Sequence, residues 1–140
     1  ELIPFIQKEY NVIESAHGRA IAVLSMGAGQ AFFIGLSNLG FFSTIASFSS
    51  GLLSDEAFEL GEFLSQSSIS PGMIDEKLEL LWLGCGKDDR RALGHKRLSK
   101  MLTDWKIEHH YTEVPGSHEW PTWRRLLVEF LPTLFREVHC

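Results

Sequence analysis

Three separate parts of the sequence carry side chains that together can perform nucleophilic catalysis. Ser25, the pair Asp88-Asp89 and His118 each follow a short stretch with the composition of a β-strand. A neutral serine is a weak nucleophile, so a histidine must take its proton and a carboxylate must fix the tautomer of that histidine. The order serine, aspartate, histidine is the order of the α/β-hydrolase triad. The pattern therefore predicts acyl transfer, with Ser25 as nucleophile and His118 as general base.

The residues around Ser25 are typical of a nucleophile elbow, the sharp strand-to-helix turn written G-x-S-x-G. Gly27 fits the second glycine of this motif, whereas Val23 occupies the place of the first. A β-branched side chain at that place is expected to press against the helix that follows. On the motif alone, the alternative is a serine that caps an ordinary helix after a strand.

Strands and helices alternate along the chain, as the fold around such an elbow requires. The apolar runs predict strands over residues 19–24, 44–48, 78–85 and 108–114. Helices are expected over residues 1–10 and 27–37, after a cap at Ser54, along Leu98, Met101, Leu102 and Trp105, and from Pro121 along Trp123, Leu127, Phe130 and Leu134. Residues 65–72 have the composition of a loop. This alternation predicts an α/β fold with a parallel sheet and helices on both faces.

Composition excludes several classes of protein. The chain has 140 residues, which fits a single domain over residues 1–140, and a net charge of −5. An acidic chain lacks the basic patch of a nucleic-acid binder. No apolar run approaches the roughly 18 residues of a membrane span. Neither Cys85 nor Cys140 has a partner at metal-ligand spacing, so we expect no metal, no other cofactor and no disulfide.

Longer strings in the sequence resemble one family of proteins. The stretches AIAVLSMGAGQA and IGLSNLGFFSTIASFSSG, then LLWLGCGKDD, then VPGSHEWPTWRRLLVEFLPTLF, occur in order over nearly the whole chain. They are similar to the C-terminal half of an esterase family within the α/β-hydrolases, which includes bacterial feruloyl and acetyl xylan esterases. The string GSHEWPTWR is the most specific of them, because it joins a glycine turn, a histidine and a tryptophan-proline helix start.

The resemblance implies a role for each matching residue. Ser25 matches the nucleophile, Asp89 the acid of the triad and His118 the base, and Asp88 is the rival of Asp89 as the acid. The backbone N–H of Met26 matches one donor of the oxyanion hole. The other donor of the family comes from a loop upstream of the first strand found here. The implied substrates are feruloyl or acetyl esters on plant-wall polysaccharide.

The remaining aromatic and imidazole side chains have more ordinary interpretations. Trp120 follows the base by two positions and is expected either to line an aromatic acyl pocket or to serve the core or helix start. The other tryptophans, at 82, 105 and 123, are expected in the core. Histidines 17, 95 and 139 are expected at the surface. His109 and His110 are neighbours on one strand, so they should point to opposite faces.

The apolar strand over residues 19–24 has consequences for assembly. In the resembling fold its inner neighbour lies upstream, so this strand is expected to be an exposed edge open to pairing with another chain. The N-terminus carries neither a start methionine nor a signal peptide, which indicates a processed or truncated chain, and the compartment is unknown. We therefore expect a companion chain with the upstream strands, as in a split hydrolase, or a homodimer. A catalytically silent interaction domain is the other alternative.

Overall fold

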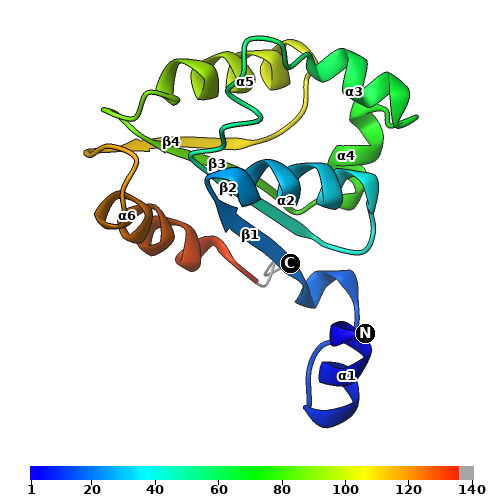
Figure 1. Ribbon diagram of the computed structural model, residues 1–140. Helices are drawn as coiled ribbons and strands as arrows, with labels where there is room; N and C mark the ends of the chain where they lie inside the picture. The colour runs from blue at the N-terminus through cyan, green and yellow to red at the C-terminus, as the bar shows by residue number, and fades with distance from the viewer. Residues whose placement is uncertain (136–140) are drawn as a thin grey trace.

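A four-stranded parallel sheet forms the centre of the computed structural model, which describes residues 1–135 (Figure 1). Its strands lie side by side in chain order: β1 (Ala20–Leu24), β2 (Thr44–Phe48), β3 (Leu80–Gly86) and β4 (His110–Val114). All three pairings are parallel. The predicted fold class and the four predicted strands are confirmed, with each strand beginning and ending within two residues of its expected bounds.

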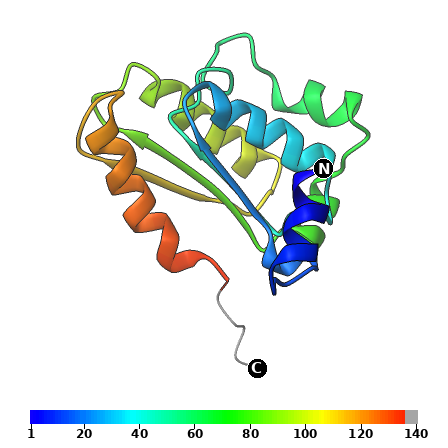
Figure 2. The same ribbon diagram turned by 60° about the horizontal axis from the view of Figure 1, so that its bottom comes forward.

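Helices cover the sheet on both faces. The helices are α1 (Leu2–Glu9), α2 (Met26–Ser37), α3 (Leu60–Gln66), α4 (Pro71–Lys77), α5 (Ala92–Asp104) and α6 (Trp120–Phe130), and single 3₁₀ turns lie at Ala16–Gly18 (η1) and Leu131–Thr133 (η2). Figure 2 shows α6 on the face opposite α2 and α5. Each face therefore has its own apolar core. No helix in residues 1–135 combines the length and apolar character that crossing a membrane requires.

Alternate residues of each strand supply the two cores. Ile45 and Leu83 point to the larger core beneath α2 and α5, whereas Ala46 and Trp82 point to the smaller core beneath α6. All five residues of β2 are buried, since this strand has a neighbour on both sides and a helix layer on both faces. Such burial explains why the strands read as continuous apolar runs in the sequence.

The structure differs from the sequence predictions in two helical regions. No helix follows Ser54; its hydroxyl donates to the carbonyl of Gly51 within a series of turns. The next helix, α3, begins only at Leu60. The expected loop over residues 65–72 is shorter, because Ser70 caps the unpredicted helix α4 by accepting from the N–H of Met73 at 3.3 Å. Ser54 did not mark the start of a helix, because serine also favours turns.

The apolar faces of two other helices also differ in detail. On α6 the buried position is Leu126 rather than Leu127, which is 39% exposed beside β1. Trp105, expected in the core, is 44% exposed at the end of α5. Trp82 is buried as expected. Cys140 and His139 lie outside the described residues.

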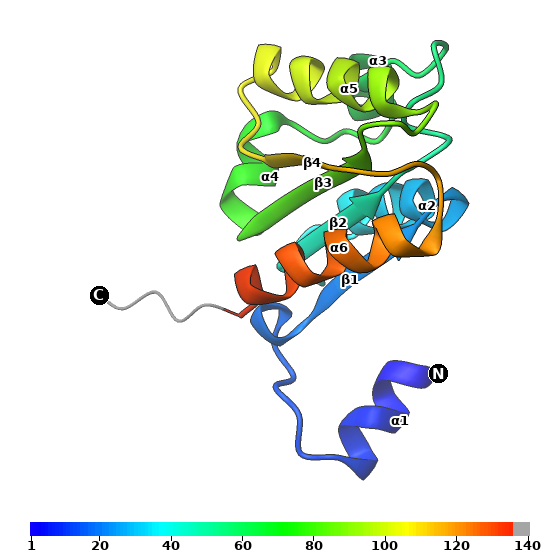
Figure 3. The ribbon, with the colours of Figure 1, turned by 90° about the vertical axis from the view of Figure 1, so that its left-hand side faces the viewer.

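Within residues 1–135, no strand pairs with the outer edge of β1. Helix α1 has no buried residue and projects from the body on this side (Figure 3). Between α1, β1 and the end of α6 lies an apolar groove of about 570 Å³. Val23 on β1 is 38% exposed, whereas its partner in the register, Ser47 on β2, is completely buried. The β1 strand therefore has the exposure expected of an unpaired edge.

His95 is buried, contrary to the expectation from the sequence. It was expected at the surface but lies in α5 with no exposed area, and neither ring nitrogen has a hydrogen-bond partner within residues 1–135. Burial lowers the pKa of His95 to about 4, because a protonated imidazole would lose its hydration there. A histidine beside Lys96 and Arg97 in the sequence thus faces the interior.

This buried histidine predicts a pH dependence of stability. The unfolded chain protonates His95 below its ordinary pKa of about 6.5, whereas the folded protein does so only near pH 4. The free energy of unfolding should therefore fall as the pH drops from 6.5 to 4, by on the order of 3 kcal/mol for this group. Urea unfolding across this range should show a shallower pH slope for His95→Leu. The surface variant His17→Gln should retain the slope, and equal slopes in all three proteins would contradict the prediction.

Candidate active site

The carboxyl ends of three strands bring Ser25, Asp89 and His118 to one edge of the sheet. Ser25 directly follows β1, Asp89 follows β3 and His118 follows β4. Backbone hydrogen bonds hold these ends together: the N–H of Ser25 donates to the carbonyl of Phe48 at 2.8 Å, and that of Asp88 donates to Gly116 at 3.0 Å. Ligands of open α/β sheets bind at this edge.

Ser25 occupies a strained turn between strand and helix. Its backbone has φ 56° and ψ −124°, a conformation that residues other than glycine rarely adopt. The Ser25 hydroxyl lies 3.0 Å from Nε2 of His118. The chain turns here as in the expected elbow, although Val23 stands at the first glycine position. Room for Val23 comes from Gly27, since a Cβ atom at Gly27 would overlap Cγ1 of Val23.

Asp89 is the carboxylate that contacts the histidine. Its Oδ2 lies 2.8 Å from Nδ1 of His118, and its side chain is nearly fully buried. Burial by itself would raise the pKa of Asp89, but hydrogen bonds from the backbone N–H of Arg91, from His118 and from Ser49 outweigh this effect and lower it. The carboxylate is therefore ionised at neutral pH. Its rival Asp88 is exposed to solvent.

Gly116 shapes the loop that presents His118. Its φ of 122° is accessible only to glycine, and a side chain here would overlap the hydroxyl of Thr122. Gly86 must also lack a side chain, because the carbonyl of Gly116 passes against it. The glycine of the GSH string thus lets the loop after β4 approach the end of β3.

Two tryptophans extend from the imidazole toward β1. Trp123 packs edge-on against His118 with ring centroids 4.8 Å apart, and Trp120 packs in the same way against Trp123 at 5.3 Å. Trp120 is 64% exposed, which rules out the core role considered for it. Both rings line an apolar hollow of about 260 Å³ together with Val23 and Leu24.

Arg91 is a component of the site that the sequence analysis missed. Its Nη1 lies 3.5 Å from the Ser25 hydroxyl and 3.4 Å from the carbonyl of Ser49, and it also contacts both ring nitrogens of His118. The sequence feature that could have indicated Arg91 is its position two residues after Asp89, in the turn that follows a strand. Charged residues in such a turn are usually solvated, so composition alone did not distinguish Arg91 from its exposed neighbour Arg90.

The other reactive groups lie elsewhere or are unsuited to catalysis. Burial raises the pKa of Cys85 to about 12, so this thiol does not compete with Ser25 as a nucleophile at neutral pH. His109 contacts Ser99 on α5, and His110 stacks on Trp82 on the other face, as their adjacency predicted. Within residues 1–135, no three or more histidine, cysteine or acidic side chains are grouped so as to hold a metal ion.

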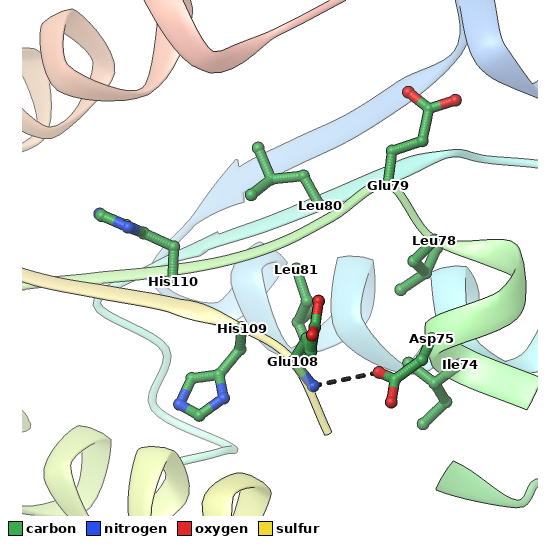
Figure 4. Close-up of a pocket in the computed structure, with 9 residues that line it drawn as sticks. All are labelled: Ile74, Asp75, Leu78, Glu79, Leu80, Leu81, Glu108, His109 and His110. Atoms are coloured by element: carbon green, nitrogen blue, oxygen red, sulfur yellow. Dashed lines mark hydrogen bonds between the residues drawn. The ribbon is translucent and has the colours of Figure 1, made fainter. Parts of the chain in front are cut away.

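A second hollow lies at the amino ends of the strands, opposite the edge that carries Ser25 and His118. It has a volume of about 370 Å³ and opens between the beginnings of β3 and β4 (Figure 4). Its polar groups already bind one another or their neighbours: Asp75 accepts from the N–H of Glu108 at 3.0 Å, and Glu79 contacts His17 at 2.6 Å. This hollow holds no nucleophile paired with a base.

Comparison with known proteins identifies the family of this chain. The sequence profile of the family described as Putative esterase matches residues 1–134, which is nearly the whole chain. The chain belongs to this esterase family. The resemblance inferred from the sequence strings is therefore confirmed.

Solved structures of esterases have the same fold. A ferulic acid esterase is 25% identical and superposes with a TM-score of 0.70, over 95% of this chain and 57% of its own. A ferulic acid esterase from Anaeromyces mucronatus is 22% identical, with a TM-score of 0.72 over 96% of this chain and 50% of its own. A fluorophosphonate-binding serine hydrolase from Staphylococcus aureus is 14% identical, with a TM-score of 0.78 over 97% of this chain and 61% of its own. This esterase chain thus spans 50–61% of the length of these relatives.

The contact between Val23 and Gly27 predicts a specific coupling. Gly27→Ala should destabilise the elbow by about 1–3 kcal/mol, because the new methyl group overlaps Cγ1 of Val23. Adding Val23→Ala, which removes that atom, should recover most of the loss. Urea unfolding of the two single variants and the double variant measures this coupling. If the double variant loses as much unfolding free energy as Gly27→Ala and Val23→Ala lose together, the crowding inferred at the elbow is absent.

Proposed function

We propose that this esterase chain carries the catalytic residues of a serine carboxylic-ester hydrolase. The observation that supports this function most directly is the pair of contacts at His118: 3.0 Å to the hydroxyl of Ser25 and 2.8 Å to the carboxylate of Asp89. Membership of the esterase family adds independent support.

The reaction follows from these positions. Ser25 attacks the ester carbonyl while Nε2 of His118 takes the hydroxyl proton, and Asp89 stabilises the imidazolium through Nδ1. The N–H of Met26, the first residue of α2, donates to the oxyanion, because amides at a helix start have no acceptor within the helix. His118 then protonates the leaving alcohol, and water releases the acid from Ser25. No metal or cofactor takes part in these steps.

The proposed substrates are feruloyl or acetyl esters on plant-wall polysaccharide. Two of the relatives are ferulic acid esterases, which supports this choice. Trp120 is proposed to contact the acyl group, since its exposed ring borders the apolar hollow next to His118. An aromatic acid would gain from stacking on such a ring.

Matched substitutions test the proposed triad in the native protein. Ser25→Ala should abolish hydrolysis of p-nitrophenyl acetate, because the nucleophile is removed. Asp89→Asn should lower kcat by about 10³–10⁴-fold, since the histidine loses the partner that fixes its tautomer. Asp88→Asn removes the same charge one residue away and should stay within about twofold of the wild-type rate.

Two results would contradict this mechanism. Full activity of Ser25→Ala would exclude Ser25 as the nucleophile, and a larger loss for Asp88→Asn would exclude Asp89 as the acid. A fluorophosphonate probe addresses the alternative of a silent interaction domain. Stoichiometric labelling at Ser25 supports an enzyme, whereas an unlabelled, folded protein supports the silent domain.

We further propose that strands of a companion chain pair with β1. Unpaired N–H and C=O groups along an apolar edge favour addition of another strand. The neighbouring groove is lined mostly by apolar residues of α1, β1 and α6, so companion strands would find an apolar surface to pack against there. The companion strands would also bring the loop with the second oxyanion donor. A homodimer that pairs through β1 would cover the edge but would not supply that loop.

Light scattering of the isolated 140-residue chain tests this assembly. We expect association or aggregation of the chain alone, and a defined complex when a polypeptide with the upstream strands is added. A symmetric dimer of the chain alone would support the homodimer instead. A monodisperse 15.8 kDa species with a cooperative melt would show that the sheet protects its own edge, and the proposal would be wrong.

A further inference from the structure

Arg91 places a positive charge directly beside the nucleophile and the base. Its Nη1 is 3.5 Å from the Ser25 hydroxyl and contacts both ring nitrogens of His118. None of the proposed catalytic steps uses this guanidinium. Arg91 directly precedes α5, and its backbone N–H donates to the carboxylate of Asp89 at 3.0 Å, so the side chain starts from a fixed position in the site.

The guanidinium is half-buried and has no carboxylate partner among residues 1–135. Its partners are the Ser25 hydroxyl, the carbonyl of Ser49 and the imidazole. Asp89 is close in sequence, but its carboxylate accepts from the backbone N–H of Arg91 rather than from the side chain. Gly51 leaves room for the guanidinium, since a Cβ atom there would lie 3.2 Å from Nη2. A partly desolvated cation without a counter-ion favours an anion from outside the chain.

The contact with His118 has a consequence for the base. Nε2 of a neutral imidazole has a single lone pair, and it must accept the Ser25 proton for the reaction to start. Arginine only donates hydrogen bonds, whereas Nδ1 itself donates to Asp89 and the lone pair of Nε2 faces the Ser25 hydroxyl. The imidazole therefore has no free lone pair for the guanidinium, although the two groups are in contact.

We infer that Arg91 binds a carboxylate group of the substrate, located within a few bonds of the ester carbonyl. This inference rests on the proposed esterase function. A carboxylate that accepts from Nη1 at about 2.8 Å lies within about 6 Å of the Ser25 hydroxyl. The same anion thus positions the ester and gives the guanidinium an acceptor that the imidazole does not provide.

Two kinds of ester meet this requirement. In a hemi-ester of a short dicarboxylic acid, the carboxylate is on the acyl side. In an ester of a 2-hydroxy acid, it is on the alcohol side, next to the leaving oxygen that His118 protonates. Both contain a carboxylate near the carbonyl, and matched pairs of substrates distinguish them.

The experiment compares charged and neutral esters of the same shape. Mono-p-nitrophenyl succinate is paired with p-nitrophenyl butyrate for the acyl side, and O-butyryl lactate with isopropyl butyrate for the alcohol side. kcat/KM is measured for the native protein, Arg91→Met, Arg91→Lys and the matched control Arg90→Met. Arg90 is the exposed neighbour, so this control removes the same charge outside the site.

We expect the wild type to prefer the charged ester in at least one pair. Arg91→Met should lower the charged-to-neutral ratio of kcat/KM by about 10- to 100-fold, the range for a hydrogen bond between charged groups. Arg91→Lys should restore part of the ratio, and Arg90→Met should leave it unchanged. In the wild type, KM for the charged ester should rise with ionic strength.

The negative results separate this inference from the proposed function. If neutral esters are hydrolysed in a Ser25-dependent way and the ratio is the same in the wild type and Arg91→Met, the esterase stands and the role of Arg91 is refuted. If the charged ester shows no salt dependence in the wild type, the role is refuted even where Arg91→Met does not fold. If no ester reacts and Ser25 is not labelled by a fluorophosphonate, both proposals fail.

Discussion

The hydrogen bond between Asp89 and His118 joins two loops that leave neighbouring strands, and the arrangement of the site depends on it. Parallel pairing of β3 with β4 brings Gly86 beside Val114, so the two loops start side by side. The aspartate is buried, which would be costly for an unpaired carboxylate. Donors from three directions keep it ionised, and one of them is the imidazole itself. This contact thus orients the imidazole and, together with the N–H of Arg91 and with Ser49, keeps the carboxylate ionised.

Close backbone approach accounts for the small residues around this contact. Gly86 and Gly116 allow the loop after β4 to pass over the end of β3, while Gly27 accommodates the side chain of Val23 beneath α2. Each glycine lies where two elements meet rather than in an open turn. Valine replaces the glycine that usually stands two residues before the serine of this motif. The turn at Ser25 accommodates Val23 because Gly27, which faces its side chain, has no side chain of its own.

Much of this arrangement was predictable from the sequence because the sheet is covered on both faces. Continuous apolar runs such as the one over residues 78–85 therefore gave the strands, and the residues just after them gave Ser25 and His118. Spacing alone did not separate Asp89 from Asp88; the resemblance to the family did. Arg91 and His95 were missed because their local composition is that of a solvated helix start. What directs both side chains inward is tertiary packing, which no short window of sequence contains.

The strand order of the sheet, β1-β2-β3-β4, is also the order in which a ribosome makes these strands. Each new strand can therefore pair with a neighbour that has already left the ribosome, without waiting for a later segment. Ser25, the proposed nucleophile, directly follows the first strand of this series, and His118, the proposed base, lies in the loop after the last, 93 residues later. In a nascent chain, the proposed triad is therefore complete only when the loop after β4 has been made and has folded.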